Sequence, residues 1–174
     1  MTRSRIRNGI DRDALEALTG EQAEAAPLAV RTDWVGGAQS VATITRGPAS
    51  GTRTFTIQVD DARARIGTGA GPAPAELAAV ALSAAFAQAF VMQASRCDVA
   101  IDALSVHVQA PPPARSDPRT IPRWHIECTV ESCASLPLLR SFAREAASSD
   151  HVLRLAMRKP CVTVGRSLGE RGAR

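Results

Sequence analysis

The residues most able to do chemistry in this chain of 174 residues are its four cysteines. They stand at Cys97, Cys128, Cys133 and Cys161, a spacing that holds neither a CxxC pair nor a zinc-binding pattern. Cys133 comes just before an expected helix, where the helix dipole can lower the pKa of a thiol. A lone cysteine is more often a buried or unreactive residue, so inert packing is favoured over catalysis for all four, with Cys133 and then Cys97 as the candidate nucleophiles.

Two histidines are the other candidates for chemistry. His107 and His125 fall on the polar faces of two expected neighbouring strands, so they could lie close together. Two histidines supply half of a zinc site, and the sequence offers no evident third ligand. Solvated or hydrogen-bonded histidines are therefore favoured, and neither a metal nor a cofactor is predicted.

The stretch from Gly67 to Arg96 must position whatever site exists. A loop rich in glycine and proline leads into a helix that starts at Pro74, with Glu76 at the positive end of the helix dipole. Leu77 to Ser95 holds no charged residue, and both faces of this helix are apolar, which is typical of a helix that is buried on all sides or lies in a membrane. Burial against a partner helix is favoured and no membrane is predicted, because alanine contributes little transfer free energy and polar residues interrupt the run.

Alternating apolar residues and turn signals predict the remaining strands, and apolar residues at helical spacing predict the remaining helices. A meander of strands is expected over 28–35, 41–45 and 54–59, and after the long helix come strands over 104–109 and 123–130, helices over 135–147 and 150–157, and a strand over 161–164. This order predicts an α+β fold, in which helices are segregated from an antiparallel sheet. Residues 28–166 form its domain, and residues 167–174 a polar tail. Residues 1–27 form an N-terminal extension, which is either a dimer arm or a frayed terminus, and the frayed terminus is favoured. A short helix is expected within it, opened by Asp11 or Asp13, with Ile10 on its apolar side.

Composition limits the classes of function. The chain is 45% hydrophobic and 22% charged, which is typical of a globular protein. Its net charge is +4, but its one arginine cluster, Arg3, Arg5 and Arg7, has no aromatic residues around it, so nucleic-acid binding is not expected. The N-terminus lacks the apolar segment of a signal peptide, so a cytoplasmic location with reduced thiols is expected.

Three segments together resemble a known family. FTIQVD at Phe55–Asp60, GAGPAPAEL at Gly69–Leu77 before the alanine-rich helix, and ALSV at Ala103–Val106 resemble the OsmC/Ohr family of osmotically inducible and organic-hydroperoxide-resistance proteins. The likeness covers about 28–164, and the GPxPxEL helix entry is its most specific part. The resemblance implies an intertwined homodimer, with the two central helices packed side by side and flanked by the sheets.

The resemblance also implies a peroxidase, but the functional positions differ. Family enzymes reduce organic hydroperoxides with a cysteine on the central helix, a second resolving cysteine, an activating arginine and a glutamate at the helix entry. In this chain the corresponding residues, in that order, are Ala85, Asp150, Ala38 and Ala75. A thiol is needed to form and resolve a sulfenic acid, so the family's cysteine mechanism is not expected here.

Two functions are open at this point. The first is a divergent member that binds an apolar small molecule in a pocket at the dimer interface, or serves another repurposed role, since alanine at these positions widens and depolarises the site. The expected pocket residues are Ala75, Glu76, Ala85, Phe86, Asp150 and His151. The alternative is an enzyme: a hydroperoxide reductase that uses a relocated cysteine such as Cys133 or Cys97, or another acid–base reaction at Asp150 and His151.

Overall fold

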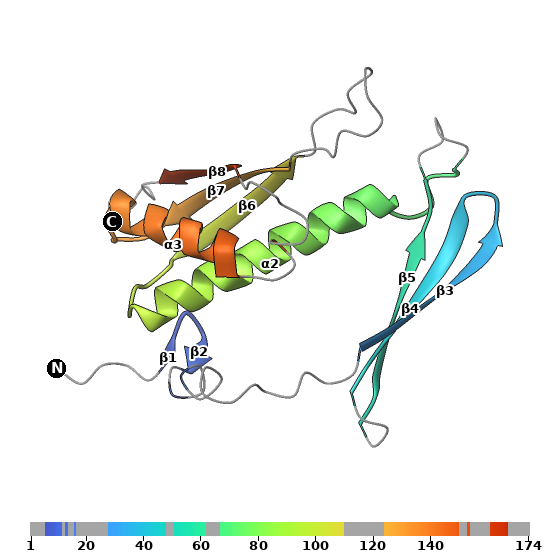
Figure 1. The fold of residues 1–174 in the computed structure, drawn as a ribbon, viewed down its shortest axis with the longest axis horizontal. Coiled ribbons are helices and arrows are strands. Elements are labelled where there is room, and N and C mark those ends of the chain that lie inside the picture. Colours follow the sequence, from blue (N-terminus) through green and yellow to red (C-terminus); the bar gives the residue numbers. More distant parts are fainter. Residues whose placement is uncertain are drawn as a thin grey trace, which may run out of the picture. The chain divides into compact units, whose positions relative to one another are not determined.

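A computed structural model gives the fold, shown in Figure 1. The residues that it describes are 6–11, 13, 16, 28–47, 51–61, 67–109, 124–149, 153 and 161–166. The chain divides into a smaller unit, residues 21–78, and a larger unit, residues 1–20 with 79–174. The long helix α2, Pro74–Arg96, begins in the smaller unit and continues through the larger one.

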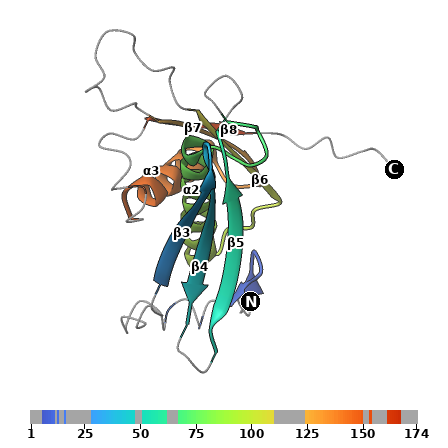
Figure 2. The same cartoon turned by 90° about the vertical axis from the view of Figure 1, so that its right-hand side faces the viewer.

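The smaller unit is a three-stranded antiparallel meander, as predicted. Its strands are β3 (Leu28–Gly36), β4 (Gln39–Arg46) and β5 (Arg53–Val59), which lie side by side in chain order in Figure 2. Gly36 and Gly37 form the β3–β4 turn with φ values of 145° and 55°, which residues with a side chain rarely adopt. The glycine pair thus fixes the turn that the sequence indicates.

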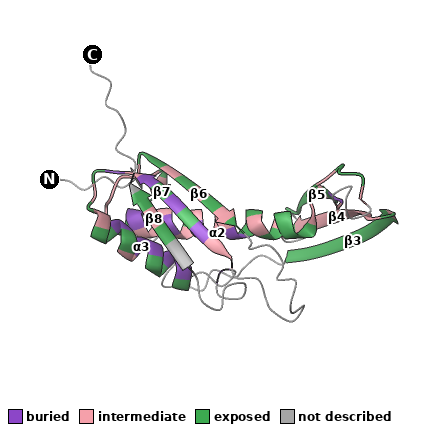
Figure 3. Ribbon diagram, turned by 90° about the horizontal axis from the view of Figure 1, so that it is seen from above, coloured by how far each residue is buried: buried purple, intermediate pink, exposed green. Residues whose placement is uncertain are grey.

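One face of this sheet is apolar, and its β3 side is exposed. The register places Val30 opposite Ile44 and Ile44 opposite Phe55, so one face collects the apolar side chains of all three strands. Leu28, Val30 and Trp34 on that face are 66%, 60% and 76% exposed, and β3 is coloured as exposed in Figure 3. Among the described residues of the smaller unit only Val59 and Asp60 are buried, so this sheet has no core of its own.

The larger unit contains the hydrophobic core. Its sheet has the order β6 (Ala103–Gln109), β7 (His125–Glu131), β8 (Cys161–Arg166), and α3 spans Leu136–Ser149. The β6–β7 pair is antiparallel as predicted, whereas β8 lies parallel to β7, so this sheet is mixed. Buried residues of α2, β7 and α3 form one cluster, in which the ring of Phe90 meets that of Phe142 edge to face at 6.1 Å.

Only one side of α2 is buried within this chain. Leu82, Phe86 and Phe90, spaced four residues apart, are in the core, whereas Val80 is 61% exposed and Ala84 is exposed as well. Within a single chain α2 is therefore buried on one side, because α3 and the sheet of β6 to β8 cover one face of the helix, and burial of its other side against a partner helix stays a prediction. By length and composition α2 is able to span a membrane, a test that core helices of soluble proteins also pass; 22% of its most apolar window is buried.

Residues 6–11 of the N-terminal extension form a hairpin. β1 (Ile6–Arg7) pairs with β2 (Ile10–Asp11), so the predictions of Ile10 in a helix and of a frayed terminus are wrong for residues 6–11. Asp13 and Glu16 are helical, and Oδ1 of Asp11 accepts a hydrogen bond from the amide of Asp13 at 2.9 Å. Asp11 therefore caps a helical turn, as its position before Asp13 suggests.

Candidate functional site

The entry to α2 holds two of the predicted pocket residues. Ala75 and Glu76 are both exposed in the first helical turn. Oε2 of Glu76 accepts a hydrogen bond from the amide of Ala73 at 2.7 Å, and the amide of Leu77 donates to the carbonyl of Ala73 at 3.0 Å. This is half of a capping box, so Glu76 stabilises the start of its own helix.

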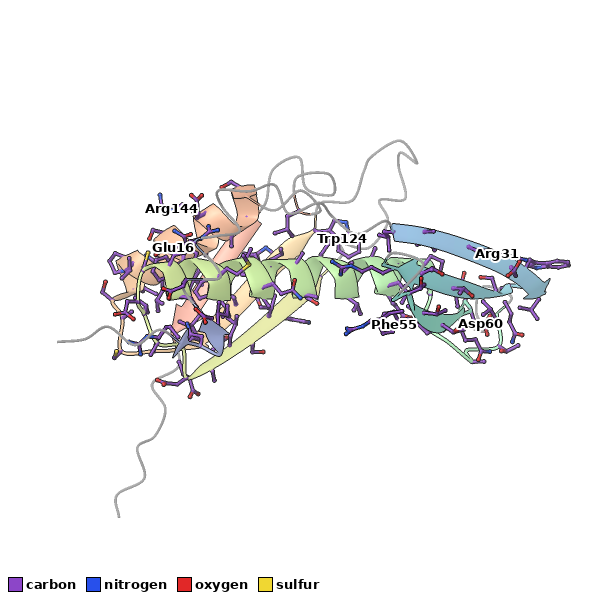
Figure 4. The ribbon with its side chains drawn as sticks, turned by 90° about the horizontal axis from the view of Figure 1, so that it is seen from below. Glu16, Arg31, Phe55, Asp60, Trp124 and Arg144 are labelled. Carbon is purple, nitrogen blue, oxygen red and sulfur yellow. The ribbon has the colours of Figure 1, made fainter. Side chains whose placement is uncertain are left out.

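A buried carboxylate holds the loop before this helix. Asp60 follows β5, where Figure 4 labels it, and has no exposed surface. Its Oδ2 accepts from the hydroxyl and the amide of Thr68 at 2.6 and 3.0 Å and from the amide of Ala70 at 3.0 Å, and Oδ1 accepts from the amide of Asp61 at 2.8 Å. The Thr68 hydroxyl, followed by the Ala70 amide, holds the pKa of Asp60 well below its usual range.

A further contact joins this loop to the turn that carries Ala38. Nε2 of Gln39 donates to the hydroxyl of Thr68 at 2.8 Å. The β3–β4 turn with Ala38 is therefore connected to the loop before α2 through Gln39, Thr68 and Asp60. Ala38 itself offers only a methyl group, so the connection positions backbone and supplies no cation.

The remaining predicted pocket residues are placed differently. Ala85, on α2 in the larger unit, is half-buried against the core. Phe86 is fully buried, with its ring 6.2 Å from that of Phe90. The core of this chain encloses the ring of Phe86, and its place beside a pocket at a dimer interface stays a prediction. Asp150 and His151 lie outside the described residues.

An apolar groove runs along another side of α2. It has a volume of about 420 Å³. The residues that line it are Ile10, Ala87, Gln88, Val91 and Met92. Sequence periodicity groups Gln88 with Val91 on one stripe, but gives no sign that Ile10 joins them, because Ile10 lies some eighty residues before them in the sequence.

The thiols divide into one buried and two exposed. Cys128 faces the core from β7, and burial raises its pKa to about 11, which disfavours the reactive thiolate. Cys97 follows α2, Cys133 precedes α3, and both are exposed free thiols. Cys161 is the first residue of β8.

Glu127 separates the two histidines. His107 lies opposite Glu127 in the β6–β7 register, with Nδ1 4.0 Å from Oε2, and Nε2 of His125 is 3.5 Å from Oε1. Sequence reasoning placed the histidines together but missed the carboxylate between them, although Glu127 shares their alternation. No group of three or more His, Cys, Asp or Glu side chains suited to hold a metal ion occurs within the described part of the chain.

Comparison with known proteins gives structural matches alone. No protein-family model and no curated protein matches the sequence. A protein assigned to osmotic stress and detoxification in Psychrobacter arcticus matches with a TM-score of 0.61 at 17% identity, over 79% of this chain and 94% of that one. The organic hydroperoxide resistance protein OsmC of Legionella pneumophila matches with a TM-score of 0.59 at 13% identity, over 82% and 97%.

A third match was solved with a small molecule. A protein of Vibrio cholerae assigned to organic hydroperoxide resistance, with captopril bound in one of its active sites, has a TM-score of 0.54 at 14% identity, over 79% of this chain and 90% of that one. The element order and these matches agree with the family resemblance read from the three sequence segments. The chain therefore has the OsmC-like α+β fold of the OsmC/Ohr proteins.

Proposed function

We propose that this protein is a homodimer that binds an apolar small molecule along α2 and lacks the cysteine peroxidase activity of the OsmC/Ohr family. The groove beside α2 is the observation that carries this proposal. Ala85, Gln88 and Met92 are three and four residues apart, so they share one face of the helix. The groove thus lies within a turn or two of the position where a family enzyme has its reactive cysteine.

The side chains along α2 support ligand binding over redox catalysis. Ala75 and Ala85 have methyl groups where family enzymes have a glutamate and a cysteine. Four of the five groove residues are apolar, and the amide of Gln88 is the one polar group among them. Ligand pockets are commonly built this way, with apolar walls and few polar groups. The captopril in the Vibrio cholerae protein is an example of this fold with a small organic molecule bound.

Two uncovered apolar surfaces support the homodimer. One is the sheet face with Leu28, Val30 and Trp34, and the other is the side of α2 with Val80 and Ala84. Apolar patches of this extent on a monomer mark interaction sites. A two-fold dimer covers identical surfaces on both copies, and a second α2 would close the open side of the groove.

Sedimentation tests the dimer. We expect native protein to sediment as a dimer and Ala84→Glu, which puts a charge on the uncovered side of α2, to sediment as a monomer with unchanged circular dichroism. Leu138→Glu, at a 38% exposed residue of α3, is the matched control and should remain dimeric. A native monomer at micromolar concentration would contradict this part of the proposal.

Two assays test binding and the loss of peroxidase activity. We expect the neutral dye N-phenyl-1-naphthylamine to gain fluorescence in the native protein. With dithiothreitol present, cumene hydroperoxide should not be consumed faster than in the protein-free control, and intact mass should stay unchanged. Turnover that Cys133→Ser or Cys97→Ser abolishes would reject the proposal in favour of a hydroperoxide reductase with a relocated thiol.

A further inference from the structure

We infer that the N-terminal hairpin, residues 6–11, is a wall of the ligand groove and that Ile10 determines which apolar ligands fit. This inference rests on the proposed function, because it concerns the same groove. Among the described residues that line the groove, Ile10 is the one outside α2, and it is half-buried. Its position depends on the hairpin, since β2 has only two residues and its partner is the equally short β1.

Asn8 fastens the hairpin to the end of α2. Its Nδ2 donates to the hydroxyl of Ser95 at 3.1 Å and to the carbonyl of Val99 at 3.0 Å, while its Oδ1 accepts from the amide of Ile101 at 2.8 Å. The backbone of Asn8 has a φ of 53°, a left-handed conformation that asparagine tolerates better than most residues. One side chain at the hairpin turn thus makes three hydrogen bonds to the segment that leaves the helix.

Two further contacts hold the strand before it. Nε and Nη2 of Arg7 both lie 2.9 Å from Oδ1 of Asp98, with the two side chains 30% and 22% exposed. The hydroxyl of Ser95, which is fully buried, donates to the carbonyl of Val91 at 2.8 Å, and the carbonyl of Arg7 lies 3.2 Å from the same hydroxyl. The hairpin therefore contacts the last turn of α2 through Ser95 and the segment after the helix through Asp98.

The anchoring fixes where Ile10 lies. Ile10 comes two residues after Asn8, so its branched side chain stands beside α2 at Val91 and Met92, one turn before the anchored end at Ser95. Among the described lining residues only the side chain of Gln88 offers hydrogen bonds, and the flexible side chain of Met92 adapts its shape readily. The groove therefore suits an uncharged molecule with an alkyl or aromatic body and a single hydrogen-bonding group, and the bulk of residue 10 limits the body's length.

Substitution of Ile10 tests this wall. Ile10→Trp should fill the groove and weaken binding of N-phenyl-1-naphthylamine tenfold or more. Ile10→Ala should lengthen the groove. In competition with the dye, 1-octanol, 1-decanol and 1-dodecanol compare the affinity for alkyl chains of different length. The Ile10→Ala protein should prefer longer alcohols than the native protein does, with an affinity gain of about fourfold for each further methylene that becomes buried. Asn8→Ala, which releases the hairpin, should shift the preference as Ile10→Ala does. Leu138→Trp on α3 is the matched control and should bind the dye as the native protein does.

The outcomes separate this inference from the proposed function. If native protein binds the dye and both Ile10 variants bind it and the alcohols unchanged, the hairpin is not a wall and the inference alone is overturned. If native protein binds neither dye nor alcohol, the groove has no ligand of this class, and the proposed function is overturned along with it. Circular dichroism and sedimentation of each variant show that the fold and oligomeric state are retained.

Discussion

The hydroxyl of Thr68 donates to Oδ2 of Asp60 at 2.6 Å and accepts from Nε2 of Gln39 at 2.8 Å. This single hydroxyl joins the start of β4 to a buried carboxylate after β5. Because Asp60 also accepts from three backbone amides, the loop that leads into α2 is fixed by one charged group. Hydrogen bonds to charged groups are stronger than those between neutral groups, which explains how a loop rich in glycine keeps one conformation.

Stability should therefore depend on pH through Asp60. Its folded pKa lies below the unfolded value of about 4, so its stabilising contribution is complete above that pH and is lost as the pH falls towards the folded pKa. We expect Asp60→Asn to unfold at lower urea than native protein at pH 7, and the difference to narrow below about pH 4. Urea titrations at pH 3, 4, 5 and 7 measure this, and a difference that stays constant across the series would contradict it.

A close backbone approach makes one glycine of this loop sensitive to substitution. A Cβ on Gly71 would lie 2.5 Å from the carbonyl oxygen of Gln58, which is too close for any side chain. We expect Gly71→Ala to lower the free energy of unfolding by about 1–3 kcal/mol, as overpacking does. Gly51→Ala is the control, because a Cβ there meets nothing within 4 Å. Equal stability of the two variants, measured by urea titration, would show that the loop moves freely away from β5.

Sequence reasoning succeeded where local chemistry determines the structure. Pro74 begins α2 as predicted, and alternation located β3 to β8 to within a few residues of their bounds. It failed where the hydrogen-bond partners of a residue lie far away in the sequence. Nothing near Asn8 indicates that its side chain meets Ser95 and Ile101, because a hairpin of two-residue strands is too short to show alternation.

In the candidate site, too, sequence reasoning identified residues but not their contacts. Asp60 and Glu76 both belong to the segments that resemble the OsmC/Ohr family, yet their hydrogen-bonding roles follow from loop and cap geometry that spacing does not reveal. Phe86 was expected beside a pocket because it adjoins Ala85, where the resemblance places the reactive cysteine, and a helix that is apolar all round gives no indication of which face meets the core. The packing of α3 and β7 decides that question, and it places Phe86 inside.

The three thiols with described surroundings should differ in reactivity. We expect iodoacetamide to modify Cys97 and Cys133 at pH 8 within minutes and to leave Cys128 unmodified in the folded protein, since burial raises the pKa of Cys128 to about 11 and blocks access. Peptide mapping by mass spectrometry distinguishes the sites, and modification in urea is the control for Cys128. Rapid modification of Cys128 in the native protein would show that β7 opens in solution.

The two sides of α2 should respond differently to truncation. Phe90 is fully buried against Phe86 and Phe142, so Phe90→Ala should lower the free energy of unfolding by about 3–5 kcal/mol at any protein concentration. Val80 is 61% exposed in one chain, so Val80→Ala should cost little unless a second copy covers it. In a dimer the folded state gains stability with protomer concentration, so a loss caused by Val80→Ala would appear as a weaker dependence of the unfolding midpoint on concentration. Urea titrations of both variants at 1 and 50 µM protein measure the unfolding midpoint and its dependence on concentration. If both quantities are the same for Val80→Ala and for the native protein, Val80 is excluded from any dimer interface.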